Sequence, residues 1–281
     1  MKKNIFFILI IIFLSFFSYL DEAKDAKIHF IDVGEGDAIL VETPDGKTIL
    51  IDTGNLITGF RLIEYLKKHN IFHIDYLIFS HPHPDHIGGA FFVLQMLKVN
   101  KIYDNGQDLA EISKTSDLHR WYLKLVRNNN AYNVLQAGDT FLLDGISFKT
   151  LWPYRPLMFS DFNANSLVIM VEYLGFRCLL EGDLNPDAEG ELLKTEGNLK
   201  VDVLKVTHHG GGNIVSDEFL KRVSPRTAII SVDKDNIKGY PSQELLQRLK
   251  NFKIIIYRTD INQDIIIKIK KTGKFIITTD K

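Results

Sequence analysis

Four potential metal ligands stand within six consecutive residues of the chain. Residues 81–86 read HPHPDH, and the two prolines fix φ at alternate positions and hold the residues before them in extended geometry. In an extended segment the side chains at i and i+2 point to the same side, so His81 and His83 can converge on one point. Asp85 and His86, where the chain turns, face another point. This layout indicates two neighbouring metal positions.

The ligand types restrict which metal such a site would hold. Imidazole and carboxylate ligands suit Zn, Mn or Fe, and the lack of thiolates argues against a purely structural zinc site. The only cysteine, Cys178, lies in an apolar run and is expected to be a buried, inert thiol. In the alternative interpretation residues 81–86 are a polar surface loop, and Asp85 caps a helix that begins at Ile87. Asp85 could also be a cap and a ligand at once.

Further carboxylates and imidazoles follow predicted strands elsewhere in the chain. The residues found just past a predicted strand are Asp52, Asp183, His208 and His209. Loops gather at strand ends, so we expect these side chains to meet the HPHPDH segment in one site.

The surrounding elements predict the fold class. Antiparallel hairpins followed by alternating strands and helices occur twice, over residues 27–103 and 141–257, and the alternation implies parallel pairing through crossover helices. We therefore predict an α/β fold with two sheets face to face and helices outside, a four-layer αββα sandwich. A helix is expected over Ile87–Leu97, opening with Gly88 and Gly89, whose missing side chains would allow a close approach to the sheet or the metals.

The composition is that of an ordinary globular protein. The chain has 281 residues, 45% of them hydrophobic and 25% charged. It carries 34 Lys and Arg against 35 Asp and Glu, so no global basic field recommends a nucleic-acid partner. The scattered candidates for a local basic track are Lys205, Lys221, Arg222 and Arg226.

The N-terminus differs in kind. Lys2 and Lys3 precede Ile5–Leu20, a run of apolar character without a charge, and residues 1–26 are predicted to be a signal sequence or membrane anchor with a short spacer. Export is therefore expected, to an extracellular or periplasmic location or to the outer face of the cytoplasmic membrane. Cleaved and retained forms both stay open, and a buried core helix is the alternative. The catalytic domain would span residues 27–281.

These residues resemble a known family. The HPHPDH segment followed by Ile87-Gly88-Gly89 resembles the HxHxDH signature of the metallo-β-lactamase superfamily. Several other stretches are similar to the C-terminal hydrolase domain of ComEC-type DNA-internalisation competence proteins, and the resemblance covers about residue 27 to the C-terminus. These stretches are residues 30–38, 163–168, 181–184, 204–210 and 257–260.

The resemblance implies a site with two divalent metal ions, Zn or Mn. The implied ligands are His81 and His83 for the first metal, Asp85, His86 and His208 for the second, and Asp183 as the bridge. Asp52 would orient a ligand histidine from behind, although a turn residue at a strand end is a fair rival. Asp32 and Asp37 match acidic positions of the family, and hydrogen bonding within a tight glycine turn explains them nearly as well.

The chain departs from the family pattern at several positions. Many relatives supply a further histidine to the first metal from the segment that here contains Asn163, Asn165 and Ser166, as in the competence group. Tyr240 stands where that group usually has histidine, Gly211 where it has serine, and Glu35 where it has glutamine. The first departure implies modest affinity for the first metal, and the changes at positions 240 and 211 touch expected substrate contacts.

A paired metal site favours phosphodiester hydrolysis. Two cations lower the pKa of a shared water to about 7 and neutralise charge on the phosphate oxygens. Asp85 would orient this water or accept its proton, and His209 or Tyr240 would assist the leaving group. A packing role for His209 is an equal alternative.

The leading hypothesis is an exported, metal-dependent phosphodiesterase, most plausibly a nuclease that degrades DNA. One alternative is hydrolysis of another phosphate ester, for instance on cell-envelope polymers, and another is a metal-binding scaffold whose catalysis has lapsed. β-Lactam hydrolysis ranks lower, because the ligand set departs from that branch. A membrane is a partner only through an uncleaved N-terminal segment, and no protein partner is predicted.

Overall fold

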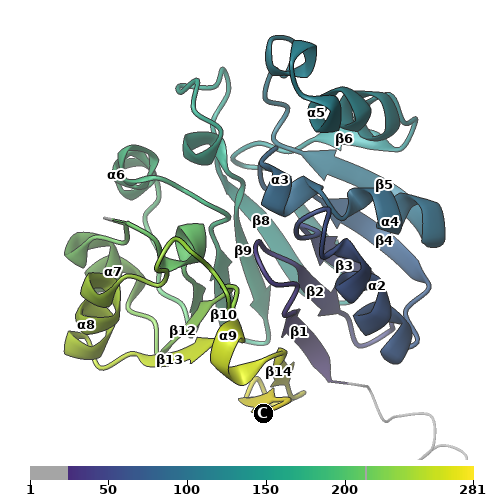
Figure 1. Cartoon of the computed structure of the whole chain (residues 1–281). Helices are drawn as coiled ribbons and strands as arrows, with labels where there is room; N and C mark the ends of the chain where they lie inside the picture. The colour runs from purple at the N-terminus through teal and green to yellow at the C-terminus, as the bar shows by residue number, and fades with distance from the viewer. Residues whose placement is uncertain (1–24, 213) are drawn as a thin grey trace, which may run out of the picture.

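The computed structural model describes residues 25–212 and 214–281, which form two β-sheets covered by helices (Figure 1). The first sheet has the strand order β15-β14-β1-β2-β3-β4-β5-β6 and the second β13-β12-β11-β10-β9-β8-β7. The strands of the first sheet are β1 (Ala26–Phe30), β2 (Ile39–Glu42), β3 (Thr48–Ile51), β4 (His73–Ile78), β5 (Lys98–Asp104), β6 (Tyr132–Val134), β14 (Ile265–Ile269) and β15 (Phe275–Thr279). Those of the second are β7 (Thr140–Leu143), β8 (Ile146–Trp152), β9 (Val168–Tyr173), β10 (Phe176–Leu180), β11 (Val203–Lys205), β12 (Thr227–Ile230) and β13 (Ile255–Arg258).

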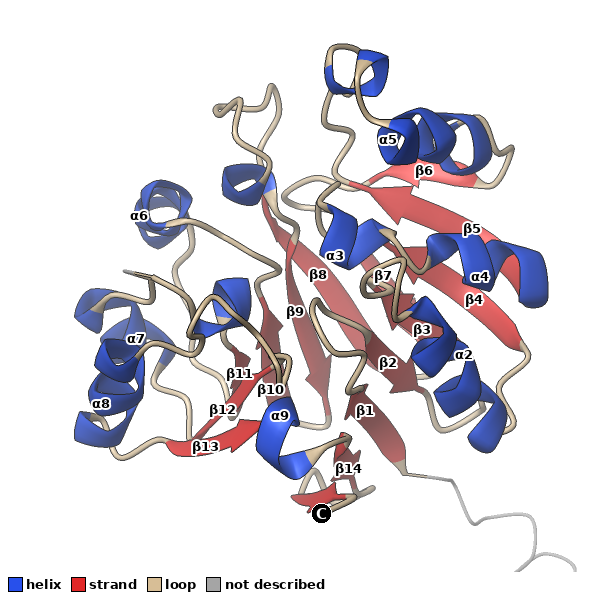
Figure 2. Cartoon of the chain, viewed as in Figure 1, coloured by secondary structure: helices blue, strands red, loops and turns tan. Residues whose placement is uncertain are grey.

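Helices lie on the outer side of each sheet (Figure 2). Those beside the first sheet are α2 (Gly59–Lys68), α3 (Pro84–Ile87), α4 (Ala90–Met96) and α5 (Asp117–Tyr122). Those beside the second are α6 (Pro186–Thr195), α7 (Asp217–Val223) and α8 (Gln243–Asn251), and the short α9 (Thr259–Asn262) leads from β13 to β14. Helix, sheet, sheet and helix follow one another, which confirms the predicted αββα sandwich.

Three apolar clusters hold these four layers together. The middle cluster lies between the sheets and includes Ile28, Val41 and Phe148. The outer clusters bury the apolar faces of the helices, for example Leu62 of α2 and Leu220 of α7, against the far side of each sheet. Removal of these faces from water drives the layers together.

The parallel part of each sheet determines where polar side chains gather. In the first sheet β3, β4 and β5 are parallel, and in the second β10, β11 and β12 are parallel. Crossover helices connect these strands, as the alternation in the sequence predicts. The carboxyl ends of parallel strands meet at one edge of their sheet, so the loops after β3, β4, β10 and β11 can build one site.

The helix predicted over residues 87–97 differs in the structure. It begins earlier, as α3, with Pro84 in the first turn, where the fixed φ of proline suits a helix start. It breaks at Gly88 and Gly89 because both glycines are pressed against the loop after β3. A Cβ on Gly88 would lie 2.3 Å from the Leu56 nitrogen, and one on Gly89 would lie 2.0 Å from the Thr53 oxygen. The predicted close approach is therefore made to this loop.

The predicted N-terminal segment, residues 1–26, falls almost entirely outside the described residues and stays a prediction. Across the part of the chain that the structure does describe, none of the helices combines the length and apolar character that a bilayer crossing requires.

Candidate metal centre

The loop after β4 presents its ligands to residues from the second sheet. His81, His83 and Asp183 place one ligand atom each within 4.8 Å of one another, and so do Asp85, His86, Asp183 and His209. Asp183 belongs to both groups. One of its oxygens, Oδ2, lies 3.3 Å from His86 Nε2 and 3.8 Å from His81 Nε2. Asp183 is thus the residue that the two groups share.

The cluster contains polar atoms that nothing else in the described structure satisfies. Three buried atoms of this cluster, His86 Nε2, His209 Nε2 and Asp183 Oδ1, have no hydrogen-bond partner among the described residues. Unpaired buried polar groups are costly, and imidazole nitrogens and carboxylate oxygens are metal ligands. The residues present therefore fit a divalent metal centre.

Hydrogen bonds fix the histidine rings of the second group from behind. His86 Nδ1 donates to Asp52 Oδ2 at 2.8 Å, and His209 Nδ1 donates to the Ser231 carbonyl at 3.0 Å. Each bond selects the tautomer whose Nε2 lone pair faces the cluster. Asp52 in turn accepts bonds from both the backbone NH and the hydroxyl of Ser80. The predicted orienting role of Asp52 matches this geometry.

The HPHPDH loop is held from outside as well. His119 of α5 donates from Nε2 to the Pro82 carbonyl at 2.8 Å, between the two histidines of the first group. Asp85 makes no capping bond to α3. Its Oδ2 instead lies 3.3 Å from His209 Nε2, so the side chain turns toward the cluster and the helix-cap interpretation does not apply.

Burial and charge shift the pKa values of the cluster in opposite directions. Burial lowers the pKa of His81 and of His83. Burial also opposes a charge on His86, but the carboxylates of Asp183 and Asp52 outweigh it and raise the His86 pKa well above its usual value. For Asp183, burial is outweighed by the neighbouring imidazoles of His86 and His209, which hold its pKa well below the usual range. Asp183 is therefore an ionised carboxylate at neutral pH.

A buried lysine lies directly beneath the centre. Lys205 of β11 is fully buried, forms an ion pair with Asp37, and lies 3.3 Å from the Gly182 carbonyl. Asp37 Oδ1 is 3.8 Å from His209 Nδ1. Asp37, Asp52 and His86 form a third group with metal-ligand spacing, and its cation is already supplied by the Lys205 ammonium. The prediction of Lys205 as part of a surface basic track is wrong, because its ammonium is buried and paired with Asp37.

The structure differs from the sequence prediction at the paired histidines. His209, not His208, joins Asp85, His86 and Asp183. Both residues have positive φ, 48° and 54°, so the chain turns sharply here and the two rings point to different surroundings. The His208 ring is half-buried, 5.9 Å from the Tyr240 ring, and makes no hydrogen bond to a described residue. Nothing in the dipeptide His-His says which ring faces the metals, so the sequence carried no signal for this choice.

The departures from the family pattern at positions 211 and 240 are explained by one packing contact. A Cβ on Gly211 would lie 2.2 Å from the Tyr240 ring, so the tyrosine fills the space that a side chain at position 211 would need. Tyr240 itself is half-buried and lies beside His208 rather than within either ligand group.

The Asn165 side chain is bonded to its own loop and to the loop after β5. Asn165 Nδ2 lies 2.6 Å from Gln107 Oε1 and 2.7 Å from the Phe159 carbonyl. Asn163 and Asn165 belong to neither ligand group. Asp32 is also outside them, and its Oδ1 accepts the backbone NH of Gly34, as the glycine-turn interpretation expects.

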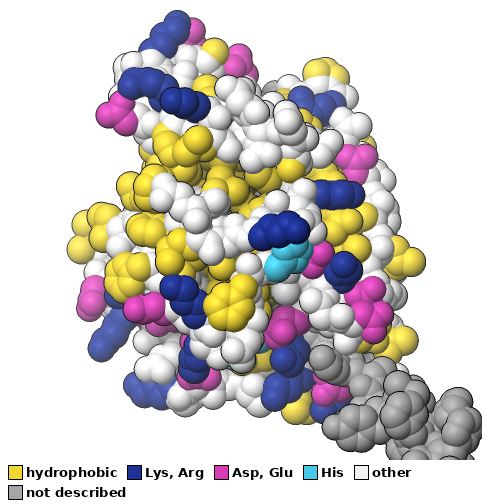
Figure 3. All heavy atoms as spheres, turned by 90° about the vertical axis from the view of Figure 1, so that its right-hand side faces the viewer, with side chains coloured by type: hydrophobic (Ala, Val, Ile, Leu, Met, Phe, Trp, Pro, Cys, Tyr) yellow, Lys and Arg dark blue, Asp and Glu magenta, His cyan; other side chains and the backbone are white. Residues whose placement is uncertain are grey.

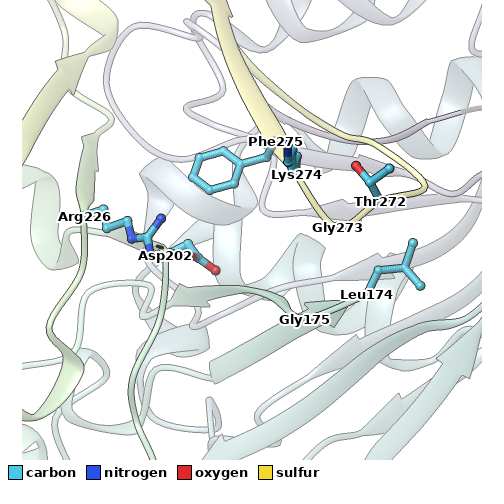
Figure 4. A pocket seen from close by; sticks show the side chains of 8 residues that line it. All are labelled: Leu174, Gly175, Asp202, Arg226, Thr272, Gly273, Lys274 and Phe275. Carbon is cyan, nitrogen blue, oxygen red and sulfur yellow. Dashed lines mark ion pairs between the residues drawn. The ribbon is translucent and has the colours of Figure 1, made fainter.

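Two other surface features are separate from this centre. A groove of about 440 Å³ lies between the β9–β10 and β14–β15 turns, where Arg226 faces Asp202 (Figure 4). On the face formed by α2, α4 and α5, hydrophobic side chains cover much of the surface, and Lys and Arg alternate with Asp and Glu (Figure 3). Neither feature forms a continuous basic track.

Fold and site together are those of the metallo-hydrolase class: an αββα sandwich with histidine and aspartate groups that could bind metal at one edge. The family model of the metallo-beta-lactamase superfamily matches residues 31–233, and the chain belongs to that superfamily.

The curated relatives are competence proteins, which confirms the predicted resemblance. ComE operon protein 3 of Bacillus subtilis is 32% identical over 93% of this chain, and competence protein ComA of Neisseria gonorrhoeae is 28% identical over 90%. Recombination protein 2 of Haemophilus influenzae is 30% identical over 84%. The chain spans about a third of the length of these relatives, between 28% and 35%.

Solved structures share the fold at low sequence identity. The metallo-beta-lactamase fold protein YhfI from Bacillus subtilis aligns over 90% of this chain and 100% of its own, with a TM-score of 0.54 and 12% identity. Igni18, a metallo hydrolase from Ignicoccus hospitalis, aligns over 91% of this chain and 100% of its own, with a TM-score of 0.52 and 16% identity.

Proposed function

We propose that the protein is a metal-dependent phosphodiesterase with two divalent cations, Zn or Mn, and that its substrate is DNA. The observation that carries the proposal is the place of Asp183 in both ligand groups. Two cations that share a carboxylate stand close enough to act on one phosphate. The competence and recombination functions named for the relatives support DNA as the substrate.

The charge of the centre suits an anionic substrate only once metals are present. Asp37, Asp52, Asp85 and Asp183 supply four carboxylates, and Lys205 supplies one ammonium. This negative excess would repel a phosphodiester. Two divalent cations would turn it into a small positive one.

The chain's own residues then have distinct tasks. When bound, the metal pair supplies a water of lowered pKa and stabilises charge on the phosphate. Asp85 is partly exposed at the second group, where it would orient the attacking water or take up its proton. The other carboxylates and the imidazoles hold and orient the centre. His209, predicted as a leaving-group residue, has Nδ1 bonded to the Ser231 carbonyl and Nε2 turned to the ligand group, which leaves Tyr240 for the leaving group.

A substrate panel with metal titration tests the proposal. The full chain is stripped of metal, reloaded with Zn or Mn, and offered single-stranded DNA, duplex DNA, an aryl phosphodiester and phosphomonoesters. We expect hydrolysis of DNA and the aryl diester. Asp183→Ala should lower kcat/KM by more than about a hundredfold, since the metals contribute several kcal/mol to transition-state stabilisation. The control is Asp187→Ala, an exposed carboxylate at the start of α6.

Three results would contradict this assignment. Undiminished activity in Asp183→Ala would remove the bridging role. Turnover of phosphomonoesters without any diester would favour the alternative substrate class, and full metal loading without turnover of any ester would favour a metal-binding scaffold.

We further propose that the enzyme is exported, on the strength of residues 1–26. Cell fractionation with an epitope after Lys281 tests this. Recovery of the protein in the cytoplasm alone would contradict it.

A further inference from the structure

An ion pair lies in the same pocket as His209 of the second ligand group. Lys238 Nζ is 2.5 Å from Glu35 Oε1, and the two side chains remain 46% and 41% exposed. They come from the loop between β1 and β2 and from the loop between β12 and α8. With His209 and Tyr240 they line a small pocket. The pair therefore joins two loops at a pocket that a candidate metal ligand, His209, also lines.

The loop that carries Glu35 is fixed against the metal-ligand loop. A Cβ on Gly36 would lie 1.8 Å from the Asp85 carbonyl oxygen, and Gly36 has a φ of 108°. The backbone NH of Asp37 donates to the same carbonyl at 3.3 Å. Because this backbone cannot retreat, Glu35 can change its position only by rotating its side chain.

The loop that carries Lys238 is also closed on itself. The Asn236 side chain accepts the backbone NH of Tyr240 at 2.8 Å and donates to the Tyr240 carbonyl at 3.0 Å. These two hydrogen bonds between the Asn236 side chain and the Tyr240 backbone hold Lys238 on a narrow turn. Its ammonium is thus presented at the pocket by a defined backbone.

The electrostatic field of nearby carboxylates acts on the Lys238 ammonium. Burial opposes its charge, but the hydrogen bond with Glu35 and the carboxylates of Glu35 and Asp85 outweigh it and raise the Lys238 pKa. Lys238 in turn contributes to lowering the pKa of His208, after the larger effect of burial. The ammonium is therefore electrostatically coupled to groups on both sides of the pocket.

A half-exposed ion pair of this kind is weak, because solvent and salt screen it. A phosphodiester brought to the metals would carry the same single negative charge as a carboxylate, but the metals would hold it as well. It can compete with Glu35 for the ammonium, which binds phosphate as a point charge.

We infer that Lys238 is an anion-binding residue of this centre, which takes a phosphate oxygen of the substrate on the His209 side, and that Glu35 is the internal anion that the substrate displaces. The inference rests on the proposed function for the identity of the substrate as a phosphate diester. It adds a binding residue and a competing group to the metal ligands.

Opposite changes in the two residues test the exchange in the full metal-loaded chain. Lys238→Met should raise KM for the phosphodiester about tenfold with a smaller change in kcat, and should reduce the salt dependence of DNA binding by about one phosphate contact. Glu35→Gln should lower KM several-fold. The matched control is Lys234→Met, an exposed lysine on the same loop, which should change neither value.

The double variant decides whether Glu35 acts through Lys238. If it does, Glu35→Gln should have no effect on KM in the Lys238→Met background. An equal lowering of KM in both backgrounds would mean that Glu35 repels the substrate on its own, and the exchange would be overturned.

Binding of inorganic phosphate, measured by calorimetry on the same metal-loaded variants, separates this inference from the proposed function. Weaker phosphate binding in Lys238→Met and tighter binding in Glu35→Gln would support it even if no diester were hydrolysed. Unchanged phosphate affinity in Lys238→Met would overturn it even if DNA were hydrolysed. Thermal unfolding of each variant should match that of the wild-type chain, because a half-exposed ion pair contributes little to stability.

Discussion

The two ligand groups of the centre differ in their number of ligands and in how firmly those ligands are held. The second group has four members, and the far nitrogens of His86 and His209 are bonded to Asp52 and to the Ser231 carbonyl. The first group has three members, of which His83 is only half-buried. Ligands that are fixed in advance lose less freedom on binding. We therefore expect the second group to bind its metal more tightly than the first.

The largest effect should come from the pair His208 and His209. His209→Ala removes a ligand with a fixed ring, so it should weaken metal binding at the second group and lower kcat/KM by about a hundredfold or more. His208→Ala should leave metal stoichiometry unchanged, because its ring lies outside both groups. Metal content after dialysis, measured by mass spectrometry, checks both. Metal loss in His208→Ala with retention in His209→Ala would reverse the assignment.

Loss of a first-group ligand should have a narrower result. His83→Ala should abolish binding of one metal equivalent and leave the other bound, since His83 belongs to the first group alone. Competition with a chelator, followed by metal analysis, should show one weak and one strong equivalent in the wild-type chain and only the strong one in this variant. Loss of both equivalents would show that the two positions fill together and would break the comparison.

Removal of the support behind His86 tests why the second group is stronger. Asp52→Asn places an amide where the His86 ring needs an acceptor, so affinity for the second metal should fall by about 10-fold to 100-fold. The first metal should be affected less. Equal weakening of both would mean that Asp52 acts on the whole loop, through Ser80.

The pH dependence of metal affinity should also separate the groups. The raised pKa of His86 means that a proton must leave before this ring binds metal, so affinity at the second group should increase as pH rises above 6.5. The lowered pKa values of His81 and His83 keep these rings neutral, so the first group should lose metal only at lower pH.

For the metal-free protein, the free energy of unfolding should depend on pH with the opposite sign. The stability that protonated His86 contributes is fully present below pH 6.5 and is lost as pH rises through its raised pKa. Metal titrations at several pH values check the statement about affinity, and denaturant titrations of the metal-free protein check the statement about stability.

The smallest effect concerns the contact between Gly211 and Tyr240. Gly211→Ala should destabilise the fold by about 1–3 kcal/mol, because the new Cβ overlaps the Tyr240 ring. The cost should largely disappear in the Tyr240→Ala background. Gly190→Ala in α6 is the control. A Cβ there meets nothing within 4 Å, and alanine should stabilise the helix by about 0.5–1 kcal/mol. Equal costs in both Tyr240 backgrounds would exclude the overlap as the cause.

Short-range patterns in the sequence predicted the fold and most of the site. The HPHPDH segment is informative because its prolines dictate local geometry, and Asp183 is informative because it follows a strand directly. His209 could not be chosen over His208, since two successive left-handed residues reorient both rings. Lys205 was assigned to the surface because lysine is rarely buried. Its partner Asp37 lies 168 positions away, and no local pattern connects them.

The sealed ammonium of Lys205 has a consequence for how the protein matures. Zinc fingers have no permanent positive charge among their ligands, and they stay unfolded until the ion arrives. Here Lys205 offsets one of the four carboxylates of the centre and three apolar clusters hold the layers together, so the sandwich can assemble first and acquire its cations afterwards. Which metal it holds would then depend on the supply in the compartment where the finished protein resides.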